Sequence, residues 1–308
     1  MSESSAPVVV AGGTGFFGSA IVEELVGRGH PVFVVSRRRP KDEDQVPGVE
    51  YLAEDLAARV PESRLPRAAT LINCAAETSG GWDAHERNSV QVVRSVVSWA
   101  AQAEGVRLLH VSSIAVLAPD ADGAVSDRSV LAEASRKGGP YIWGKVASER
   151  LAWDLARSED IDLKVYRPAA ILSGEGDEIP GQLGRRAGPL FVAVGRPAER
   201  MGVIYLKEAA IEVADMVAGW SGVPSALNGL SRTLPTKGEL VAGHRGLAPG
   251  RVVWLPRPLL GLLSRAMGIA GRSRIPDLRR VFAPLGDRPP VPAYLSLPVK
   301  DSSPGESG

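Results

Sequence analysis

Short runs of apolar residues alternate with amphipathic stretches along the first 168 residues of the chain. Runs rich in Val, Ile and Leu are typical of buried strands, whereas apolar residues three or four positions apart predict helices. The expected strands cover residues 8–10, 31–36, 49–52, 70–76, 107–111 and 163–168, and the expected helices cover 19–28, 85–104 and 140–159. Strands that alternate with helices in this way predict an α/β fold with a Rossmann-type, doubly wound parallel sheet.

The first apolar run enters a turn that contains Gly12, Gly15 and Gly18. A strand, a glycine turn and a helix in this order are typical of a dinucleotide site. The glycines let the backbone approach a pyrophosphate, which then lies at the helix N-terminus. The spacing G-x-x-G-x-x-G differs from G-x-G-x-x-G, so a tight turn without a ligand is the alternative. The other residues of the turn that are expected to line the site are Thr14, Phe16 and Phe17.

The second expected strand ends at Ser36, and Arg37 and Arg38 follow it. An Asp or Glu at this place would hold the ribose 2′-hydroxyl of NAD, and it would repel a 2′-phosphate. Guanidinium groups pair with a phosphate in forked geometry. The arginines therefore favour NADP(H) as cofactor, and a solvated basic loop is the alternative.

The ends of the third and fourth expected strands carry further candidate cofactor contacts. The Asp55 carboxylate could accept a hydrogen bond from the adenine amine or cap the next short helix, and Leu56 follows it. The fourth strand ends in the small residues Cys74, Ala75 and Ala76, which would let a cofactor lie close to the strand end. We interpret Cys74 as a small buried hydrophobic residue rather than a nucleophile.

Tyr141 and Lys145 are four residues apart, at the start of an expected helix that Pro140 opens. This spacing places the phenol and the ammonium on one helix face. A neighbouring ammonium is expected to lower the pKa of the phenol, which could then exchange a proton with a carbonyl or alcohol oxygen. Ser113, at the end of the fifth strand, could donate a hydrogen bond to the same oxygen.

These residues together resemble the extended-type short-chain dehydrogenases/reductases, a superfamily of NAD(P)-dependent epimerases, dehydratases and reductases that includes dihydroflavonol reductases and 3β-hydroxysteroid dehydrogenases. The resemblance covers about residues 8–220. The matching motifs are the glycine turn, Asp55-Leu56, Asn73-Cys74-Ala75-Ala76, His110-Val111-Ser112-Ser113, Tyr141-x-x-x-Lys145 and Arg167-Pro168-Ala169-Ala170.

The resemblance implies that Ser113, Tyr141 and Lys145 form the catalytic triad. It makes Asn88 a possible fourth member, although a residue on the helix surface is the alternative for that position. It also implies that Lys145 binds the nicotinamide ribose. The remaining cofactor contacts that it implies are Ser112, Pro168 and Ala170.

Two departures from the family pattern weaken a nucleotide-sugar substrate. Members that act on such sugars usually carry an arginine shortly before a strand that matches residues 204–206. Here that place falls on Met201, with Arg200 one residue away. Where the family often has paired acids after this strand, the chain has Lys207 and Glu208.

The chain divides by pattern into an NADP-binding Rossmann domain at residues 1–172 and a region at 173–301 that is mainly a substrate-binding lobe. Residues 203–220 read as a strand and a helix that pack back on the Rossmann core, and 302–308 as a disordered tail. Residues 228–290 hold eleven Arg or Lys against three Asp or Glu. This basic surface could attract an anionic group of the substrate, such as a phosphate or carboxylate, or it could be only a solvated surface. The stretch 259–263 is expected to line an apolar pocket rather than lie at a lipid interface.

Composition excludes several classes of protein. The 308 residues have a net charge of +1, which gives no general attraction to nucleic acid. The four histidines are scattered, so no metal site is expected. The single cysteine precludes an internal disulfide, and no secretory signal or stable membrane insertion is apparent. These features predict a cytoplasmic protein.

The sequence as a whole predicts an NADPH-dependent ketoreductase, or the reverse alcohol dehydrogenase, that acts on a mostly apolar small molecule. Tyr141 would be the acid/base. A nucleotide-sugar ketoreductase, epimerase or dehydratase on the same fold is the first alternative. A non-catalytic NADP-binding regulator is the second. A homodimer resembling that of the family is possible.

Overall fold

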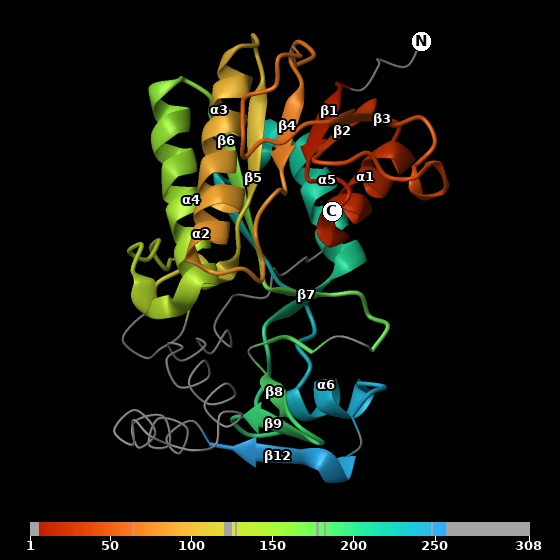
Figure 1. The fold of residues 1–308 in the computed structure, drawn as a ribbon, viewed down its shortest axis with the longest axis vertical. Helices are drawn as coiled ribbons and strands as arrows, with labels where there is room; N and C mark the ends of the chain where they lie inside the picture. Colours follow the sequence, from red (N-terminus) through yellow and green to blue (C-terminus); the bar gives the residue numbers. More distant parts are fainter. Residues whose placement is uncertain are drawn as a thin grey trace, which may run out of the picture.

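The computed structural model describes residues 6–256 apart from 64, 120–124, 127, 177–178, 182 and 248 (Figure 1). The expected tail at 302–308 and the apolar stretch at 259–263 lie outside the described residues, as does the basic region from 257 onward. Within the described part, a large sheet with helices on both faces stands above a smaller lobe (Figure 1).

A seven-stranded sheet with the order β11-β6-β5-β4-β1-β2-β3 forms the larger part, and all its strand pairs are parallel. The order reverses direction at β1, where the strand that follows in sequence, β2, lies on one side and β4 on the other. The predicted α/β fold with a doubly wound parallel sheet is confirmed. The strands are β1 Val8–Ala11, β2 Val32–Ser36, β3 Glu50–Ala53, β4 Thr70–Asn73, β5 Arg107–Val111, β6 Asp162–Pro168 and β11 Ala226–Gly229.

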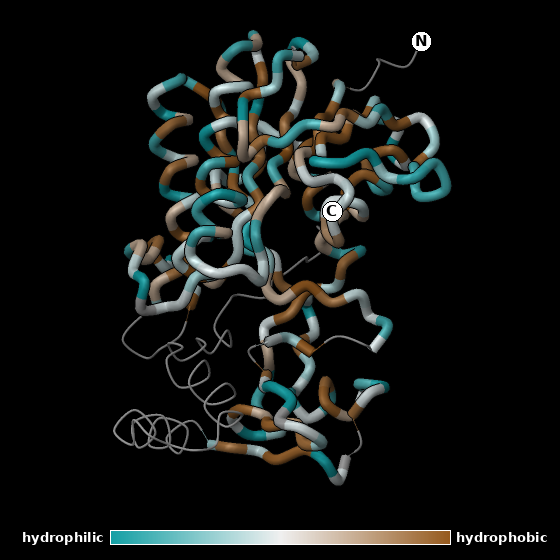
Figure 2. The backbone as a smooth tube through the Cα atoms, viewed as in Figure 1, coloured by the Kyte–Doolittle hydropathy of each residue, from teal (hydrophilic) through white to brown (hydrophobic). Residues whose placement is uncertain are grey.

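Two hydrophobic cores hold the helices on the two faces of this sheet. Val8 and Val10 of β1 face one core, which also contains Ile21. Val9 and Ala11 face the other core. Because side chains alternate along a strand, a fully apolar strand such as β1 can be buried on both faces. The first core lies under α1 Phe16–Gly27 and α5 Leu206–Ala218, and the second under α3 Val92–Ala101 and α4 Gly139–Ser158 (Figures 1 and 2).

The helix expected at 85–104 is a continuous run of three helical pieces. It begins with α2 Trp82–His85, continues as a π-helical segment Glu86–Gln91 and ends as α3. The start lies three residues before the predicted one, since Trp82-Asp83-Ala84 follow two glycines and are too few to show a helical periodicity. π-Helical turns inside α-helices are uncommon and often occur at functional sites.

Strand β11 lies in the main sheet, although its residues were expected to fall at the edge of the substrate lobe. It pairs in parallel with β6, with Ala226 opposite Val165 and Gly229 opposite Pro168. Its sequence is short and partly polar, and its residues are mostly half-buried, so hydrophobic pattern gave no strand signal. Backbone pairing to β6 and the packing of α5 place it there instead.

In the described part of the chain, the smaller lobe contains a three-stranded sheet and one short helix. β9 Leu190–Val194 lies between the antiparallel β8 Gly184–Ala187 and the parallel β12 Val252–Leu255. The helix α6 Lys237–Gly243 begins with a capping box formed by Thr236 and Glu239. A two-stranded pair, β7 Ala170–Leu172 with β10 Val203–Tyr205, connects this lobe to the main sheet. A separate apolar core that includes Phe191, Met201 and Val241 fills it.

Candidate active site

The predicted site residues gather at the carboxyl ends of the parallel strands. Because all strands of the main sheet run in the same direction, their ends meet at one edge. The order of the sheet reverses at β1, and such a switch point is where open α/β sheets bind ligands. The residues that lie at or just after these strand ends are Gly12 on β1, Ser36 on β2, Cys74 on β4, Ser112 on β5 and Pro168 on β6.

The glycine turn between β1 and α1 has the form of a cradle for an anion. Gly12 has φ +79°, and a Cβ there would lie 2.8 Å from the backbone nitrogen of Ala75 at the end of β4. A Cβ on Gly18 would lie 2.2 Å from the Gly12 carbonyl oxygen. Helix α1 has no side-chain cap at Gly15 and no acidic residue in its first turn. Its N-terminal N–H groups therefore fit a pyrophosphate.

The residues around these glycines differ in what their side chains do. Thr14 is exposed, and the Phe16 ring is 51% exposed. Phe17 packs instead against the first core, with its ring centroid 6.1 Å from that of Tyr166. The Phe17 side chain therefore belongs to the interior, and its backbone is the part available to a cofactor.

The loop after β2 leaves two arginines exposed. The Ser36 hydroxyl donates a hydrogen bond of 2.8 Å to the Arg38 carbonyl oxygen, which shapes the turn. Arg37 and Arg38 are exposed, and neither forms an ion pair with any residue in the described part of the chain. Both guanidinium groups are thus available to a phosphate at the end of β2.

Asp55 follows β3 and caps a turn. Its Oδ1 accepts the backbone N–H of Ala57 at 3.0 Å, and its Oδ2 pairs with Arg87 at 3.1 Å. Leu56 is buried in the second core. The Asp55 carboxylate thus caps a turn at 56–58 and not the short helix that was expected there, while contact with adenine stays a prediction.

Ser113, Tyr141 and Lys145 are brought together between β5 and α4. The Ser113 side chain lies near enough to the Tyr141 hydroxyl to lower its pKa, and the Ser113 oxygen accepts the N–H of Ala115 at 3.2 Å. The buried Lys145 side chain donates a hydrogen bond of 3.2 Å to the Val111 carbonyl oxygen at the end of β5. A phenol, a hydroxyl and an ammonium therefore share one small region.

Burial dominates the ionisation of this group of side chains. It raises the pKa of Tyr141, and the nearby Ser113 side chain lowers it by less. It lowers the pKa of Lys145 to about 8, while the charge of Glu149 acts in the opposite direction. The expected lowering of the phenol pKa by Lys145 is not what the structure shows, because desolvation outweighs the other influences on the phenol.

Buried polar groups of β4 and β5 lie behind the triad. Burial raises the pKa of the Cys74 thiol to about 12, which keeps it protonated and agrees with a non-nucleophilic Cys74. Asn73 Nδ2 donates a hydrogen bond of 3.2 Å to Nδ1 of His110. Burial, reinforced by the Lys145 charge, lowers the pKa of His110 to about 3. Among the residues described, no hydrogen-bond partner reaches Nε2 of His110 or Oγ of Ser112.

Asn88 belongs to a different set of contacts from the triad. It lies in the π-helical segment, and its Nδ2 donates a hydrogen bond of 2.9 Å to Oε2 of Glu77. Oε1 of Glu77 accepts the N–H groups of Thr78, Ser79 and Gly80. The Asn88 hydrogen bond is the largest influence that lowers the pKa of Glu77 to about 2. Glu77 thus fixes both Asn88 and the loop that follows β4.

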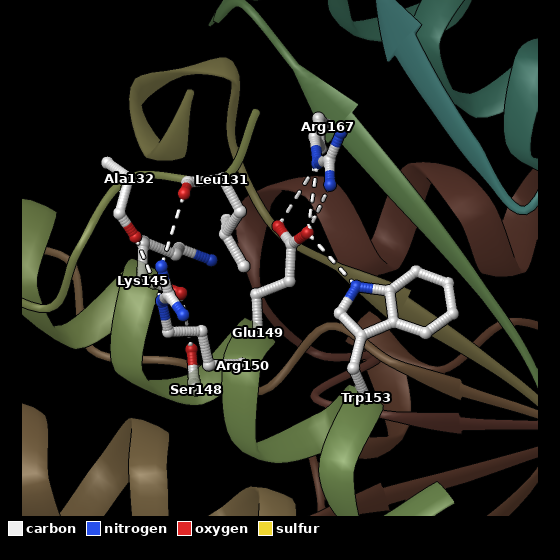
Figure 3. A network of polar contacts seen from close by, with 8 residues as sticks. All are labelled: Leu131, Ala132, Lys145, Ser148, Glu149, Arg150, Trp153 and Arg167. Carbon is white, nitrogen blue, oxygen red and sulfur yellow. Dashed lines mark hydrogen bonds and ion pairs between the residues drawn. The ribbon is translucent and has the colours of Figure 1, made fainter. Parts of the chain in front are cut away.

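A buried ion pair fixes α4, which carries Tyr141 and Lys145, to the sheet (Figure 3). Glu149 is fully buried and accepts hydrogen bonds from Arg167 of β6 at 2.5 and 3.0 Å and from Trp153 at 3.3 Å. Arg150, on the next position of the helix, donates to the carbonyl oxygens of Ala132 at 2.9 Å and Leu131 at 3.2 Å. These contacts hold α4 on two sides.

Sequence reasoning missed three residues of this region: Glu77, His85 and Glu149. Glu149 could have been found, because Tyr141, Lys145 and Glu149 follow one another at spacings of four along one helix face. Glu77 and His85 gave no sequence signal. Among the residues described, no group of three His, Cys, Asp or Glu side chains could hold a metal ion. In the same part of the chain, no helix is both long and apolar enough to cross a membrane.

Comparison with known proteins places this arrangement in a family. Residues 8–190, more than half of the chain, match the NAD dependent epimerase/dehydratase family. The chain belongs to this family. Its members are NAD(P)-dependent enzymes of the extended short-chain dehydrogenase/reductase type, so the glycine turn and the triad lie in a family of dinucleotide-binding enzymes.

The similar proteins have diverse names. A Synechocystis protein named "Putative dihydroflavonol 4-reductase" is 25% identical over 92% of this chain and 82% of its own length. DesIV, a dTDP-glucose 4,6-dehydratase from Streptomyces venezuelae, has a TM-score of 0.61 at 20% identity, over 81% of this chain and 84% of its own. The terminal R domain of the myxalamid PKS-NRPS pathway has a TM-score of 0.66 at 15% identity, over 87% of this chain and 77% of its own. The two structures at these identities indicate a shared fold.

Proposed function

We propose that this chain is an NADPH-dependent ketoreductase or alcohol dehydrogenase of the epimerase/dehydratase family. Its substrate would be a mostly apolar small molecule with a carbonyl or hydroxyl group. The placement of the Ser113 side chain near the Tyr141 hydroxyl, beside the buried Lys145, is the observation that carries the proposal. The Tyr141 phenol, which can donate a proton, and the Ser113 hydroxyl therefore lie together at the edge of the sheet where this family binds its dinucleotide.

Each side chain of the triad has a separate task in this proposal. Bound NADP(H) supplies or accepts a hydride at the substrate carbon. Tyr141 gives its proton to the substrate oxygen in reduction and takes it back in oxidation. Ser113 donates a hydrogen bond to the same oxygen and stabilises the charge that develops there. Lys145 holds the nicotinamide ribose, and its charge favours the phenolate that remains when Tyr141 has released its proton.

The cofactor would lie along the carboxyl edge of the sheet. The N-terminus of α1 and the glycine turn fit its pyrophosphate, and the small side chains of Cys74, Ala75 and Ala76 leave room beside it. Pro168 and Ala170 would lie against the nicotinamide, as in the family.

The preference for NADP(H) rests on Arg37 and Arg38, which are exposed at the end of β2. We expect the double variant Arg37→Ala/Arg38→Ala to lose NADPH affinity by about tenfold or more, because two charge-assisted contacts to the 2′-phosphate disappear. NADH affinity should stay within about twofold of wild type. Arg59, an exposed arginine that pairs with Glu54 and Glu62, supplies the matched control, Arg59→Ala. A wild-type protein that binds NADH more tightly than NADPH would contradict the preference.

The reaction itself is tested by following NADPH absorbance with a panel of aromatic and aliphatic ketones and aldehydes, together with the reverse reaction on the alcohols. We expect turnover of an apolar member of the panel, and loss of that turnover in Tyr141→Phe with NADPH binding retained. Turnover that survives in Tyr141→Phe would remove Tyr141 from the mechanism. NADPH binding without turnover of any carbonyl or alcohol would favour the regulator instead.

A nucleotide-sugar substrate is disfavoured by the residues around β10. Met201, which occupies the place of the family's phosphate-binding arginine, is buried in the core of the smaller lobe. Arg200 is exposed, and its guanidinium donates a hydrogen bond of 2.9 Å to the Leu234 carbonyl oxygen. Glu208 accepts the hydroxyl of Ser231. Tightly held NAD(H) that copurifies with the protein, and turnover of a dTDP- or UDP-sugar, would reverse this preference.

A further inference from the structure

A buried histidine lies against the ring of Tyr141. His85, in the last position of α2, is 1% exposed. Its ring centroid is 6.1 Å from that of Tyr141, and the two planes meet at 78°. We propose that His85 is a positioning residue, whose ring holds the Tyr141 phenol in the orientation from which it transfers its proton. This inference rests on the proposed role of Tyr141 as acid/base.

The backbone of α4 leaves His85 little freedom to move away from Tyr141. A Cβ on Gly144 would lie 2.8 Å from Nδ1 and 2.9 Å from Cβ of His85. The imidazole therefore fits into the space that a residue without a side chain provides. It lies between the Gly144 backbone and the Tyr141 ring, so a shift of either ring must displace the other.

The ring, and not a polar contact, is what His85 contributes in this arrangement. Neither Nδ1 nor Nε2 has a hydrogen-bond partner among the residues described. An edge-to-face contact is a favoured geometry for two ring systems. The charged groups that act on His85 are Glu77, which raises its pKa, and Lys145, which lowers it. Burial lowers this pKa most, which favours the neutral ring.

A second contact holds the other end of α2 on α4 and does not involve Tyr141. The rings of Trp82 and Trp143 meet edge to face, with their centroids 5.8 Å apart. The Arg136 guanidinium lies 5.0 Å from the Trp82 ring centroid. Because Trp82 joins the same two helices three residues before His85, the variant Trp82→Ala separates general loosening of α2 from loss of the contact to Tyr141.

The experiment compares His85→Ala and His85→Phe with the control Trp82→Ala in the full chain. Three quantities are measured: kcat and KM for the best carbonyl substrate, the NADPH dissociation constant, and the titration of the Tyr141 phenol. The titration is followed by ¹³Cζ-tyrosine NMR, with the Tyr141 signal assigned from Tyr141→Phe. It does not depend on turnover.

We expect His85→Ala to lower kcat by about tenfold to a hundredfold, as for other small displacements of a catalytic group. KM and NADPH affinity should stay within about twofold of wild type, because substrate and cofactor contacts are unchanged. The pKa of Tyr141 should fall towards its ordinary value, since water reaches the space that the imidazole filled. His85→Phe should restore most of kcat and the raised phenol pKa, and Trp82→Ala should resemble wild type in both.

Two results would overturn the proposal: wild-type kcat and phenol titration in His85→Ala, or a loss in His85→Phe as large as in His85→Ala. If His85→Ala does not fold, His85→Leu takes its place, because leucine fills similar volume without a ring edge. If the wild-type protein turns over no substrate, the proposed function fails, and the phenol titration still decides whether His85 holds Tyr141.

Discussion

The buried pair Glu149–Arg167 connects α4, the helix that carries Tyr141 and Lys145, to β6, and its removal is a severe test of how α4 is held. Glu149 is 0% exposed and Arg167 is 12% exposed, so neither charge has much access to water. In Glu149→Gln the guanidinium stays buried without its counter-ion (Figure 3). Breaking one partner of such a pair costs about 3–5 kcal/mol, because the remaining charge is uncompensated.

This cost is a large share of the total stability of a folded domain, which is about 5–15 kcal/mol. With a urea m-value of about 3 kcal/mol/M, it corresponds to a fall of about 1–2 M in the unfolding midpoint. The same substitution removes a charge that raises the pKa of Lys145, so this pKa should fall further below about 8. Urea unfolding followed by circular dichroism measures the first effect.

The exposed pair Arg67–Glu104 is the matched control. Its side chains are both 77% exposed, at a distance of 2.6 Å. Glu104→Gln should change the free energy of unfolding by no more than about 1 kcal/mol. The double replacement Glu149→Met/Arg167→Met should cost less than Glu149→Gln alone, because it leaves no unpaired charge. A midpoint for Glu149→Gln within the range of the Glu104→Gln control would refute the reasoning.

Three further outcomes follow from the structure. Glu77→Gln should lower the melting temperature at neutral pH. The pKa of the Glu77 carboxyl is about 2 in the folded protein, against an ordinary value of 4.5. The difference in melting temperature between Glu77→Gln and wild type should therefore shrink as pH falls from about 4.5 to 2. A difference in melting temperature that does not depend on pH contradicts this reasoning. Cys74 should react slowly with iodoacetamide at pH 8 in the folded protein and readily in urea, because burial raises the pKa of its thiol to about 12. The extent of labelling is measured by intact-mass spectrometry. Fast labelling of the folded protein contradicts the prediction. Gly18→Ala should destabilise the protein by about 1–3 kcal/mol in urea unfolding and weaken dinucleotide binding, because its Cβ would meet a carbonyl oxygen at 2.2 Å. Gly27→Ala, with open space around it, is the control, and equal effects of the two would count against the cradle.

The parts of the fold that follow from periodicity could be predicted from the sequence. β1, β2 and β4 are runs of mostly apolar residues that are buried along nearly their whole length, and burial on both faces of the sheet demands such residues. β5 was predicted at Arg107–Val111, as observed. β11 could not be predicted in the same way. Its half-buried residues are held by backbone pairing to β6, and such pairing leaves no pattern in the side chains.

In the candidate site, too, some features could be predicted from the sequence and others could not. Ser113, Tyr141 and Lys145 were found because fixed spacing on a strand end and a helix face places them together. The electrostatics of the site could not be found in this way, because the pKa values depend on burial by residues distant in sequence. His85 was missed for the same reason: its place depends on Gly144, 59 positions further along the chain.

The π-helical segment Glu86–Gln91 influences how the two ends of the helical run from Trp82 to Ala101 are rotated relative to each other about the helix axis. A wider turn holds one residue more than an α-helical turn, and one residue corresponds to about 100° of rotation around the axis. Val93 and Val96 are buried in the second core, whereas His85 lies against Gly144 of α4. The number of residues in this segment therefore helps to set the direction in which His85 points relative to Val93 and Val96. Deletion of one residue from this segment should displace His85 and so change the position of the Tyr141 ring, whereas deletion of one residue from an exposed loop should not.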